Sequence, residues 1–384
     1  LFNKYQIKIH FAHRTFKWSN EARGKAAVHV VIVGFSDFDI QEKRLFEYED
    51  IKGEPHEIKV SNINPYLIQG RDLVIKSRST PICNFPIMVW GSKPVDNGNF
   101  LLSEKEKEDL INAEPNSRKY IRPFISADEF LKNKTRWCLW LVGAEPNDLQ
   151  QFPLILRRIE NVREFRLKSK KLPTKIAAGY PSIFAELRQP INDFIFVPLT
   201  TSENRTYIPL GFFTSDFIIN NSASVIPKAS KFEFGVLSSF MHVVWVKHIC
   251  GRLESRFRYS NTIVYNNFPW PENPTDKQKQ VVEAAAQKVL DTRLQFPGSS
   301  LADLYDPLTM PPALVKAHQE LDKAVDLCYR PQPFPNETKR IEYLFDLYEK
   351  YTAGIFGVEK KKLSKKPTPG RLPPTVNCQL PDVN

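Results

Sequence analysis

The sequence predicts an α+β fold with three successive parts: a β-hairpin, a mixed α+β region and a group of C-terminal helices. Apolar residues alternate near the start, and the β-branched run at 26–35 (AAVHVVIVGF) is typical of a buried strand, so a hairpin is expected at 7–35. Between 120 and 270, short strand-like runs mix with apolar residues at helical spacing. Residues 275–350 contain three helical patterns, which predict a small bundle.

Capping signals indicate where several helices begin. Ser103 precedes Glu106 by three residues, and Thr275 precedes Gln278 by the same spacing, as in capping boxes. Asn336 is a further candidate cap for the last helix of the bundle.

The central region is expected to contain strands at 136–142, 194–197 and 206–213. The segment 234–250 is predicted to form one apolar helix that ends before Gly251.

The composition excludes several classes of protein. A length of 384 residues suggests two or three domains, and 42% hydrophobic with 25% charged residues is typical of globular chains. No run of 18 uncharged apolar residues occurs, so no membrane span is expected. Five cysteines without a CxxC pair argue against a disulfide framework or a zinc ribbon and favour the cytoplasm.

Positive charge is concentrated in the middle of the chain. The net charge is +11, and residues 151–265 hold 16 Lys and Arg against 8 Asp and Glu. Residues 36–115 are acidic, with 10 basic residues against 15 acidic ones. The basic segment is either a surface that binds a polyanion or an ordinary solvated surface.

No catalytic, cofactor-binding or metal-binding residue is predicted. GxGxxG and GxxxxGK[ST] loops are absent, and the histidines and cysteines do not cluster. Asn64-Pro65-Tyr66 lacks one proline of the (Asn/Asp)-Pro-Pro-(Tyr/Phe) pocket of adenine-N6 methyltransferases, and we interpret it as a loop turn.

Several long stretches resemble the C-terminal part of type IIL (MmeI-like) restriction–modification enzymes. The matching segments are 9–35, 117–130, 202–212, 234–259 and 264–271. The last, VYNNFPWP, resembles the family's boundary between the target-recognition and C-terminal helical domains.

The resemblance implies a long polypeptide with a nuclease, a helical connector, an adenine-N6 methyltransferase using S-adenosylmethionine, a target-recognition domain and a helical domain. Mg²⁺ is expected for the nuclease. This chain would lack the nuclease, the cofactor loop and the catalytic motif, and is expected neither to methylate nor to cleave DNA by itself. The implied division is 1–35 (last methyltransferase strands), 36–115 (acidic connector), 116–271 (recognition), 272–351 (helices) and 352–384 (disordered basic tail).

Glu203 and Arg205 are the main candidates for reading a base pair. They lie at the start of the strand expected at 206–213, where residues two apart face the same way. Glutamate accepts from cytosine N4 and arginine donates twice to guanine, so together they suit one C·G pair. The resemblance places base-choosing residues at this motif, and Tyr207 would continue the face. Alternatively, Glu203 and Arg205 form an exposed ion pair, worth under about 1 kcal/mol.

Further side chains are predicted to contact the DNA backbone, because basic groups and helix N-termini suit phosphates. These candidates are Lys168, Ser169, Lys170, Lys171, Arg188, Gln189, Ser238, Ser239, Arg252, Arg256 and Arg258. For Arg188 and Gln189 a base contact is equally expected. For the last three arginines the alternative is structural, with Glu254 pairing with one of them.

The predicted partners are double-stranded DNA and the nuclease and methyltransferase domains of the same polypeptide. Two alternatives remain open. One is the recognition part of an adenine methyltransferase without a nuclease, and the other is an interaction domain for an acidic protein. Sequence preference and a steep salt dependence on duplex DNA would distinguish the leading hypothesis from the interaction domain.

Overall fold

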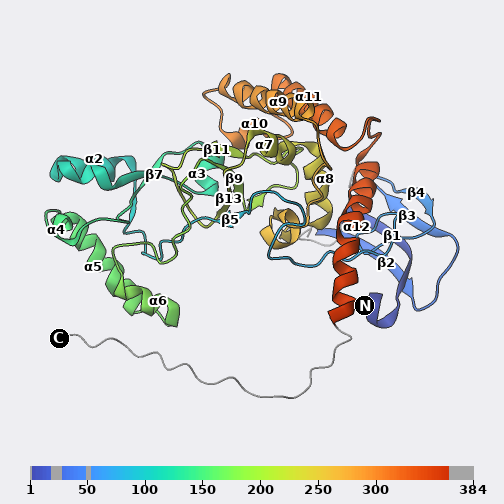
Figure 1. Ribbon diagram of the computed structural model, residues 1–384, viewed down its shortest axis with the longest axis horizontal. Helices are drawn as coiled ribbons and strands as arrows, with labels where there is room; N and C mark the ends of the chain where they lie inside the picture. The colour runs from blue at the N-terminus through green and yellow to red at the C-terminus, as the bar shows by residue number, and fades with distance from the viewer. Residues whose placement is uncertain (1, 19–27, 49–52, 363–384) are drawn as a thin grey trace, which may run out of the picture.

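The computed structural model describes residues 2–18, 28–48 and 53–362 (Figure 1). Sheets and short helices occupy the centre of the molecule, with one helical lobe at the left of Figure 1 and an N-terminal sheet at the right. Within the described residues, no helix is long and apolar enough to cross a membrane. The architecture confirms the predicted α+β class.

The N-terminal sheet contains the predicted hairpin and two more strands. Its members are β1 (Lys8–Trp18), β2 (Val28–Ser36), β3 (Lys43–Glu47) and β4 (His56–Val60), preceded by the short α1 (Phe2–Tyr5). The order is β2-β1-β3-β4; β1 pairs antiparallel with β2, in register His13 with Ile32, and parallel with β3. The first two residues of the strand expected at 26–35 lie outside the described residues.

The left lobe of Figure 1 is built on the sheet β12-β7-β8-β6. Its strands are β6 (Leu101–Leu102), β7 (Ile121–Ile125), β8 (Arg136–Leu139) and β12 (Ile218–Ile219). Its helices are α2 (Glu104–Ala113), a 3₁₀ turn at Pro115–Tyr120, α4 (Pro146–Leu149), α5 (Pro153–Leu167), α6 (Leu172–Ile176) and a turn at Ala177–Gly179, whereas α3 (Ala127–Lys132) lies nearer the centre of the molecule. Ser103 and Glu106 form the predicted capping box of α2.

A second four-stranded sheet, of order β11-β9-β13-β5, lies at the centre. Its strands are β5 (Val89–Trp90), β9 (Phe194–Pro198), β11 (Gly211–Phe213) and β13 (Ala223–Pro227), all antiparallel to their neighbours. Every residue of β9 is buried, because the sheet is covered on both faces.

The segment 36–115, expected as a connector, does not form a separate unit. It supplies β3 and β4 to the N-terminal sheet, β5 to the central sheet and β6 to the lobe. The excess of acidic residues led to the prediction of a connector. Two of its short apolar runs, β5 and β6, nevertheless pair with strands that lie farther along the sequence.

The C-terminal helices are α9 (Asp276–Leu294), α10 (Leu301–Leu304), α11 (Pro312–Tyr329) and α12 (Glu337–Lys362). Thr275 and Gln278 form the predicted capping box of α9. The first part of the tail expected at 352–384 is helical, because α12 continues to Lys362; residues 363–384 lie outside the described part of the chain.

The helix expected at 234–250 is broken into α7 (Lys231–Ser238) and α8 (Phe240–Ile249). Ser239 between them is extended, with φ −81° and ψ 161°. The first free amide of α8, Phe240 N–H, donates to Asp322 Oδ1 of α11 at 2.7 Å. A carboxylate from another helix therefore caps α8, which no local pattern in the segment indicates.

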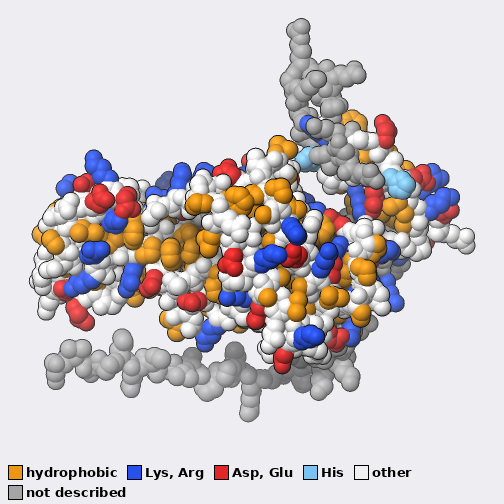
Figure 2. All heavy atoms as spheres, turned by 90° about the horizontal axis from the view of Figure 1, so that it is seen from above, with side chains coloured by type: hydrophobic (Ala, Val, Ile, Leu, Met, Phe, Trp, Pro, Cys, Tyr) orange, Lys and Arg blue, Asp and Glu red, His pale blue; other side chains and the backbone are white. Residues whose placement is uncertain are grey.

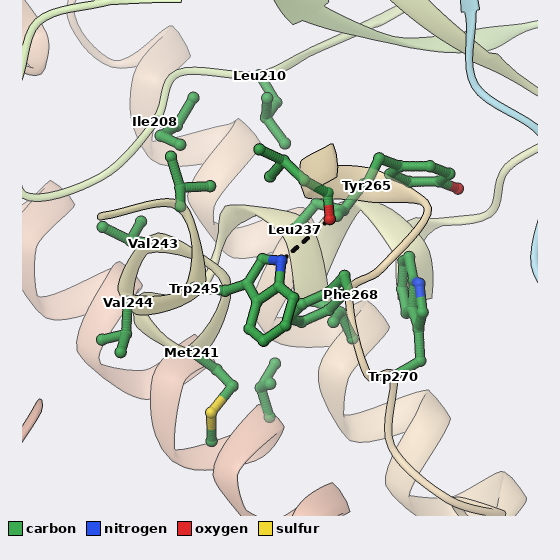
Figure 3. Close-up of a cluster of buried hydrophobic side chains, with 14 of the residues drawn as sticks. Ile208, Leu210, Leu237, Met241, Val243, Val244, Trp245, Tyr265, Phe268 and Trp270 are labelled. Atoms are coloured by element: carbon green, nitrogen blue, oxygen red, sulfur yellow. Dashed lines mark hydrogen bonds between the residues drawn. The ribbon is translucent and has the colours of Figure 1, made fainter. Parts of the chain in front are cut away.

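One apolar core joins the central sheet to the C-terminal helices (Figure 3). Trp245 of α8 is fully buried beside Phe268 and Trp270, and its Nε1 donates to Val264 O at 3.0 Å. Val264 belongs to a π-helical turn at Asn261–Tyr265. The same core contains Ile195 of β9 and Tyr348 of α12.

Gly235 permits the close approach of α7 to α9 within this core. A Cβ atom at Gly235 would lie 2.7 Å from Val282 Cγ1 and 3.3 Å from Leu321 Cδ1. We expect Gly235→Val to lower the free energy of unfolding by about 2–3 kcal/mol, because overpacking a tight core forces the helices apart. Gly298→Val is the matched control, since no atom lies within 4 Å of the added Cβ. Equal melting temperatures for the two variants would contradict this prediction.

Asp322 predicts a specific pH dependence of stability. Burial raises its pKa to about 6, although the hydrogen bonds from Phe240 N–H and the Tyr207 hydroxyl act in the opposite direction. Folding therefore takes up a proton between about pH 4 and pH 6, and this carboxyl makes the protein less stable as pH rises through that window.

We expect the difference in unfolding free energy between the native chain and Asp322→Asn to fall across pH 4–6, with a slope of up to about 1.4 kcal/mol per pH unit, and to be flat above. Urea unfolding at several pH values measures this slope. A difference that does not vary with pH would show that the carboxyl titrates normally.

Candidate nucleic-acid interface

A small three-stranded sheet brings together candidates that are about 50 residues apart in the sequence. It consists of β10 (Thr200–Thr201), β14 (Gly251–Leu253) and β15 (Arg256–Arg258), in the order β10-β15-β14. Thr200 pairs with Arg258 and Arg252 with Phe257. The chain following β10 therefore emerges beside the hairpin formed by β14 and β15.

The β14–β15 hairpin presents three arginines on an exposed surface. Arg252, Arg256 and Arg258 are all exposed, whereas Phe257 between them is 3% exposed and anchors the hairpin. Arg252 lies over the Phe257 ring, with Cζ 3.9 Å from the centroid, which fixes the direction of its guanidinium.

Each arginine also has a polar contact within the chain. Arg256 pairs with Glu254 at 2.7 Å, as the structural alternative anticipated. Arg252 Nη1 donates to Ser255 O at 2.9 Å, and Arg258 Nη1 lies 3.4 Å from Thr200 Oγ1. These contacts are exposed, so water or an anion can compete for the remaining guanidinium donors.

Glu203 and Arg205 lie in a turn, and the expected strand is confined to Gly211–Phe213. The amide of Arg205 donates to Ser202 O at 3.4 Å and its Nη1 to Thr201 Oγ1 at 3.2 Å. The argument that residues two apart share one face of a strand therefore does not apply. Both side chains are partly exposed.

The structure brings Glu203 next to the arginine hairpin. Partial burial alone would raise the pKa of Glu203, but a hydrogen bond from Ser255 and the charge of Arg252 lower it overall. Glu203 is thus held ionised as a hydrogen-bond acceptor. Burial lowers the pKa of Arg205, while Asp306 opposes that shift.

Tyr207, Ser238 and Ser239 are not available at the surface. Tyr207 is 5% exposed and donates its hydroxyl proton to Asp322, so its predicted contact with a base is not compatible with the structure. Ser238 and Ser239 are completely buried at the α7–α8 break. Asp322 occupies the helix N-terminus that was expected to receive a phosphate.

The basic turn at 168–171 lies at the end of α5, in the left lobe of Figure 1. Lys168, Lys170 and Lys171 are exposed; Lys168 lies 3.3 Å from Glu164, and Ser169 Oγ accepts from Lys171 N–H at 3.1 Å. This turn belongs to a different part of the molecule from the arginine hairpin.

Arg188 contacts the central sheet and Gln189 the sheet of the left lobe. Gln189 Nε2 donates to Phe217 O at 2.7 Å and its Oε1 accepts from Ile219 N–H at 3.3 Å, so its amide is used internally. Arg188 forms an ion pair with Glu186 and lies 5.6 Å above the exposed Trp90 ring. Arg188 remains accessible, whereas Gln189 is structural.

Within the described residues, no group of three His, Cys, Asp or Glu side chains is placed to hold a metal ion. The sequence also has no GxGxxG loop. His242, one of two histidines in the segment at 234–259, is buried, which lowers its pKa to about 3 and keeps it neutral.

The buried polar residues that hold the segment after the Glu203 turn were not predicted from the sequence. Asp322, His318 and Arg293 belong to the C-terminal helices, yet they contact residues 207–210. In the sequence these three residues differ from others only in being polar at positions on the apolar face of a helix. That difference can be recognised once the apolar face has been identified.

Three family models match the chain in succession. Residues 1–47 match the MmeI DNA-methyltransferase domain, residues 69–272 the MmeI target recognition domain and residues 274–356 the MmeI C-terminal domain. Together they include the described elements from α1 to most of α12 except β4 (His56–Val60), which lies between the first and second matched ranges.

Two known proteins are similar over most of the chain. DNA methyltransferase A of Bacillus subtilis (strain 168) is 39% identical over 349 residues, which cover 91% of this chain and 39% of that protein. A structure of the type IIL restriction–modification enzyme MmeI in complex with DNA is 50% identical, with a TM-score of 0.81, and the match covers 90% of this chain and 46% of MmeI. The chain therefore spans less than half the length of either protein. With more than half of its residues matched by the target recognition model, the chain belongs to the MmeI family.

Proposed function

We propose that this chain is the part of a restriction–modification enzyme that recognises a specific sequence in duplex DNA. The observation that carries the proposal is the exposed arginine hairpin beside the Glu203 turn, inside the part of the chain that matches a target recognition domain. A structure of the relative MmeI has been solved in complex with DNA, which supports the same partner here.

The chemistry of the Glu203 turn suits a base pair in the major groove. Glu203 offers an ionised acceptor for cytosine N4, and Arg205 offers paired donors for guanine O6 and N7. Both side chains are partly exposed on one turn, so both are accessible to a base pair. Arg252, fixed over Phe257, lies close to Glu203 and is a third candidate.

Phosphate contacts are proposed for the Lys168–Lys171 turn and for Arg188, Arg256 and Arg258, which are all accessible. Figure 2 shows one face on which Lys and Arg side chains alternate with acidic and apolar ones. Positive charge does not form one large patch on that face, so we expect a few separate phosphate contacts.

We propose that methylation of an adenine at N6 with S-adenosylmethionine and cleavage of DNA with Mg²⁺ are carried out by other domains of the same polypeptide. The relatives named a DNA methyltransferase and a restriction–modification enzyme support this assignment. The role of this chain is to position the target sequence for those domains.

Selection from a random pool of duplex oligonucleotides tests the proposal. We expect the full chain to enrich one short motif and to lose affinity steeply between about 50 and 200 mM salt, because counterions are released on binding. Salt-sensitive binding without enrichment of a motif would show that this chain binds DNA but does not read its sequence. Absence of binding at both salt concentrations would favour an interaction domain.

Exchange of the two charges in the turn is expected to change the base that is read. Glu203→Lys with Arg205→Asp should convert a preference for C·G at one position into G·C, because donors and acceptors exchange places. Repeating the selection with the double variant measures this. An unchanged motif would exclude these residues as base readers, whereas a loss of all preference would indicate that only the wild-type turn is productive.

Removal of the basic turn is expected to weaken binding without altering the motif. Lys170→Ala with Lys171→Ala should lower affinity by the same factor on every duplex and reduce the slope of log K against log salt by about 2. The matched control is Lys277→Ala with Lys323→Ala, two exposed lysines on α9 and α11. A loss restricted to one sequence would contradict a phosphate contact.

A further inference from the structure

The segment that carries Glu203 and Arg205 is anchored at Tyr207 by helix α11. The Tyr207 hydroxyl donates to Asp322 Oδ2 at 2.7 Å. Its ring stacks on His318, with centroids 4.0 Å apart and planes 19° from parallel. Tyr207 is therefore held at both its hydroxyl and its ring by residues one turn apart on α11.

A second anchor lies three residues later, at Leu210. Arg293, near the end of α9, donates from Nη1 to the Leu210 carbonyl at 2.7 Å. Leu210 is 2% exposed, so without this donor its carbonyl would lose a partner in a region that water does not reach. The guanidinium of Arg293 thus supplies the hydrogen bond that a neighbouring strand would otherwise donate to Leu210 O.

The two anchors are linked through Tyr305. Arg293 Nε donates to the Tyr305 oxygen at 2.7 Å, and that oxygen lies 2.8 Å from His318 Nε2. Arginine can only donate, so the phenol proton of Tyr305 is directed to His318 Nε2. His318 is then neutral, in agreement with the lowering of its pKa by burial, and Tyr207 stacks on an uncharged ring.

The exposed part of the segment has few restraints of its own. Residues 202–206 have no strand pairing, and the hydrogen bonds within the turn are long: Arg205 donates to Ser202 O at 3.4 Å and to Thr201 Oγ1 at 3.2 Å, and Asn204 N–H donates to Ser202 Oγ at 3.3 Å. Arg205 lies two residues from Tyr207 along the chain. The direction of the turn is consequently set by its two flanks, the pairing of β10 with β15 before it and the buried anchors after it.

From this geometry we infer that Arg293, Tyr305, His318 and Asp322 are positioning residues for sequence discrimination. Through them the C-terminal helices set the orientation of Glu203 and Arg205 against a base pair. Base reading requires side chains to be held near one geometry by a supporting shell, and this network supplies that shell. The inference rests on the proposed function.

A role in stability alone makes a different prediction. A variant that only destabilises the chain reduces the fraction of folded protein and weakens apparent binding to every duplex by one factor. The ratio of affinities between the preferred duplex and a duplex altered at one base pair does not depend on that fraction. This ratio therefore separates positioning from folding.

Tyr207→Phe in the full chain tests the inference, because it removes the hydroxyl contact with Asp322 and keeps the ring. We expect the affinity ratio at the base pair read by the turn to fall by roughly tenfold, within the range that one mismatched pair contributes. Ratios at other positions of the motif should stay constant. The matched control is Tyr265→Phe, which removes one buried hydroxyl contact, with Pro86 O at 2.6 Å, away from the segment.

Arg293→Met provides a second variant should Tyr207→Phe fail to fold, and Arg293→Lys should restore part of the ratio by donating to Leu210 O. Unchanged ratios in Tyr207→Phe and Arg293→Met, with wild-type preference intact, would overturn the inference and leave the proposed function standing. A wild-type chain that shows no preference would overturn both. An equal loss of ratio in Tyr265→Phe would also overturn it.

Discussion

One apolar core extends from the central recognition sheet to the last helix, and the rest of the structure depends on it. It contains β9, both halves of the broken α7–α8 segment and faces of α9, α11 and α12. Because the core is continuous across the junction near residue 272, the recognition part and the C-terminal helices do not form independent bodies. Burying Trp245, Phe268 and Trp270 requires both parts.

The shared core explains why polar side chains of the C-terminal helices support the recognition turn. Gly235 of α7 lies close to Val282 of α9 and Leu321 of α11. His318 of the same helix α11 stacks on Tyr207. Backbone groups enclosed there need partners, and the chain supplies Asp322 for the Phe240 amide and Arg293 for the Leu210 carbonyl. The cost of leaving such groups unpaired, about 1–3 kcal/mol each, makes these contacts a requirement of the fold.

Local patterns in the sequence predicted the elements whose causes are local. The capping boxes at Ser103 and Thr275 and the hairpin of β1 and β2 are all present, since each depends on residues close together in the chain. Features that depend on distant partners were missed. The break at Ser239 requires a cap from α11, and the strand expected at 206–213 is short because only its last residues find a partner in β9.

The candidate site was predicted in composition but not in arrangement. Arg252, Arg256 and Arg258 are exposed beside the Glu203 turn, although strand pairing with β10, which brings them there, cannot be derived from spacing. On α9, Val281 is 50% exposed, while its neighbour Val282 is fully buried. A displacement of one residue along a helix is enough to change which side chains face the core, and periodicity alone does not resolve it.

The buried residues that hold the turn are different from the exposed residues proposed to contact bases, so base preference can change without a change in packing. Tyr207 and Leu210 carry the packing, whereas Asn204 and Thr206 are exposed and Glu203 and Arg205 partly so. Surface substitutions usually alter stability by less than about 0.5 kcal/mol, so replacements in the turn leave the core and its anchors in place. The same anchors can then present a different set of donors and acceptors at the same position. A turn held by buried side chains thus permits new base preferences without rebuilding the domain that carries it.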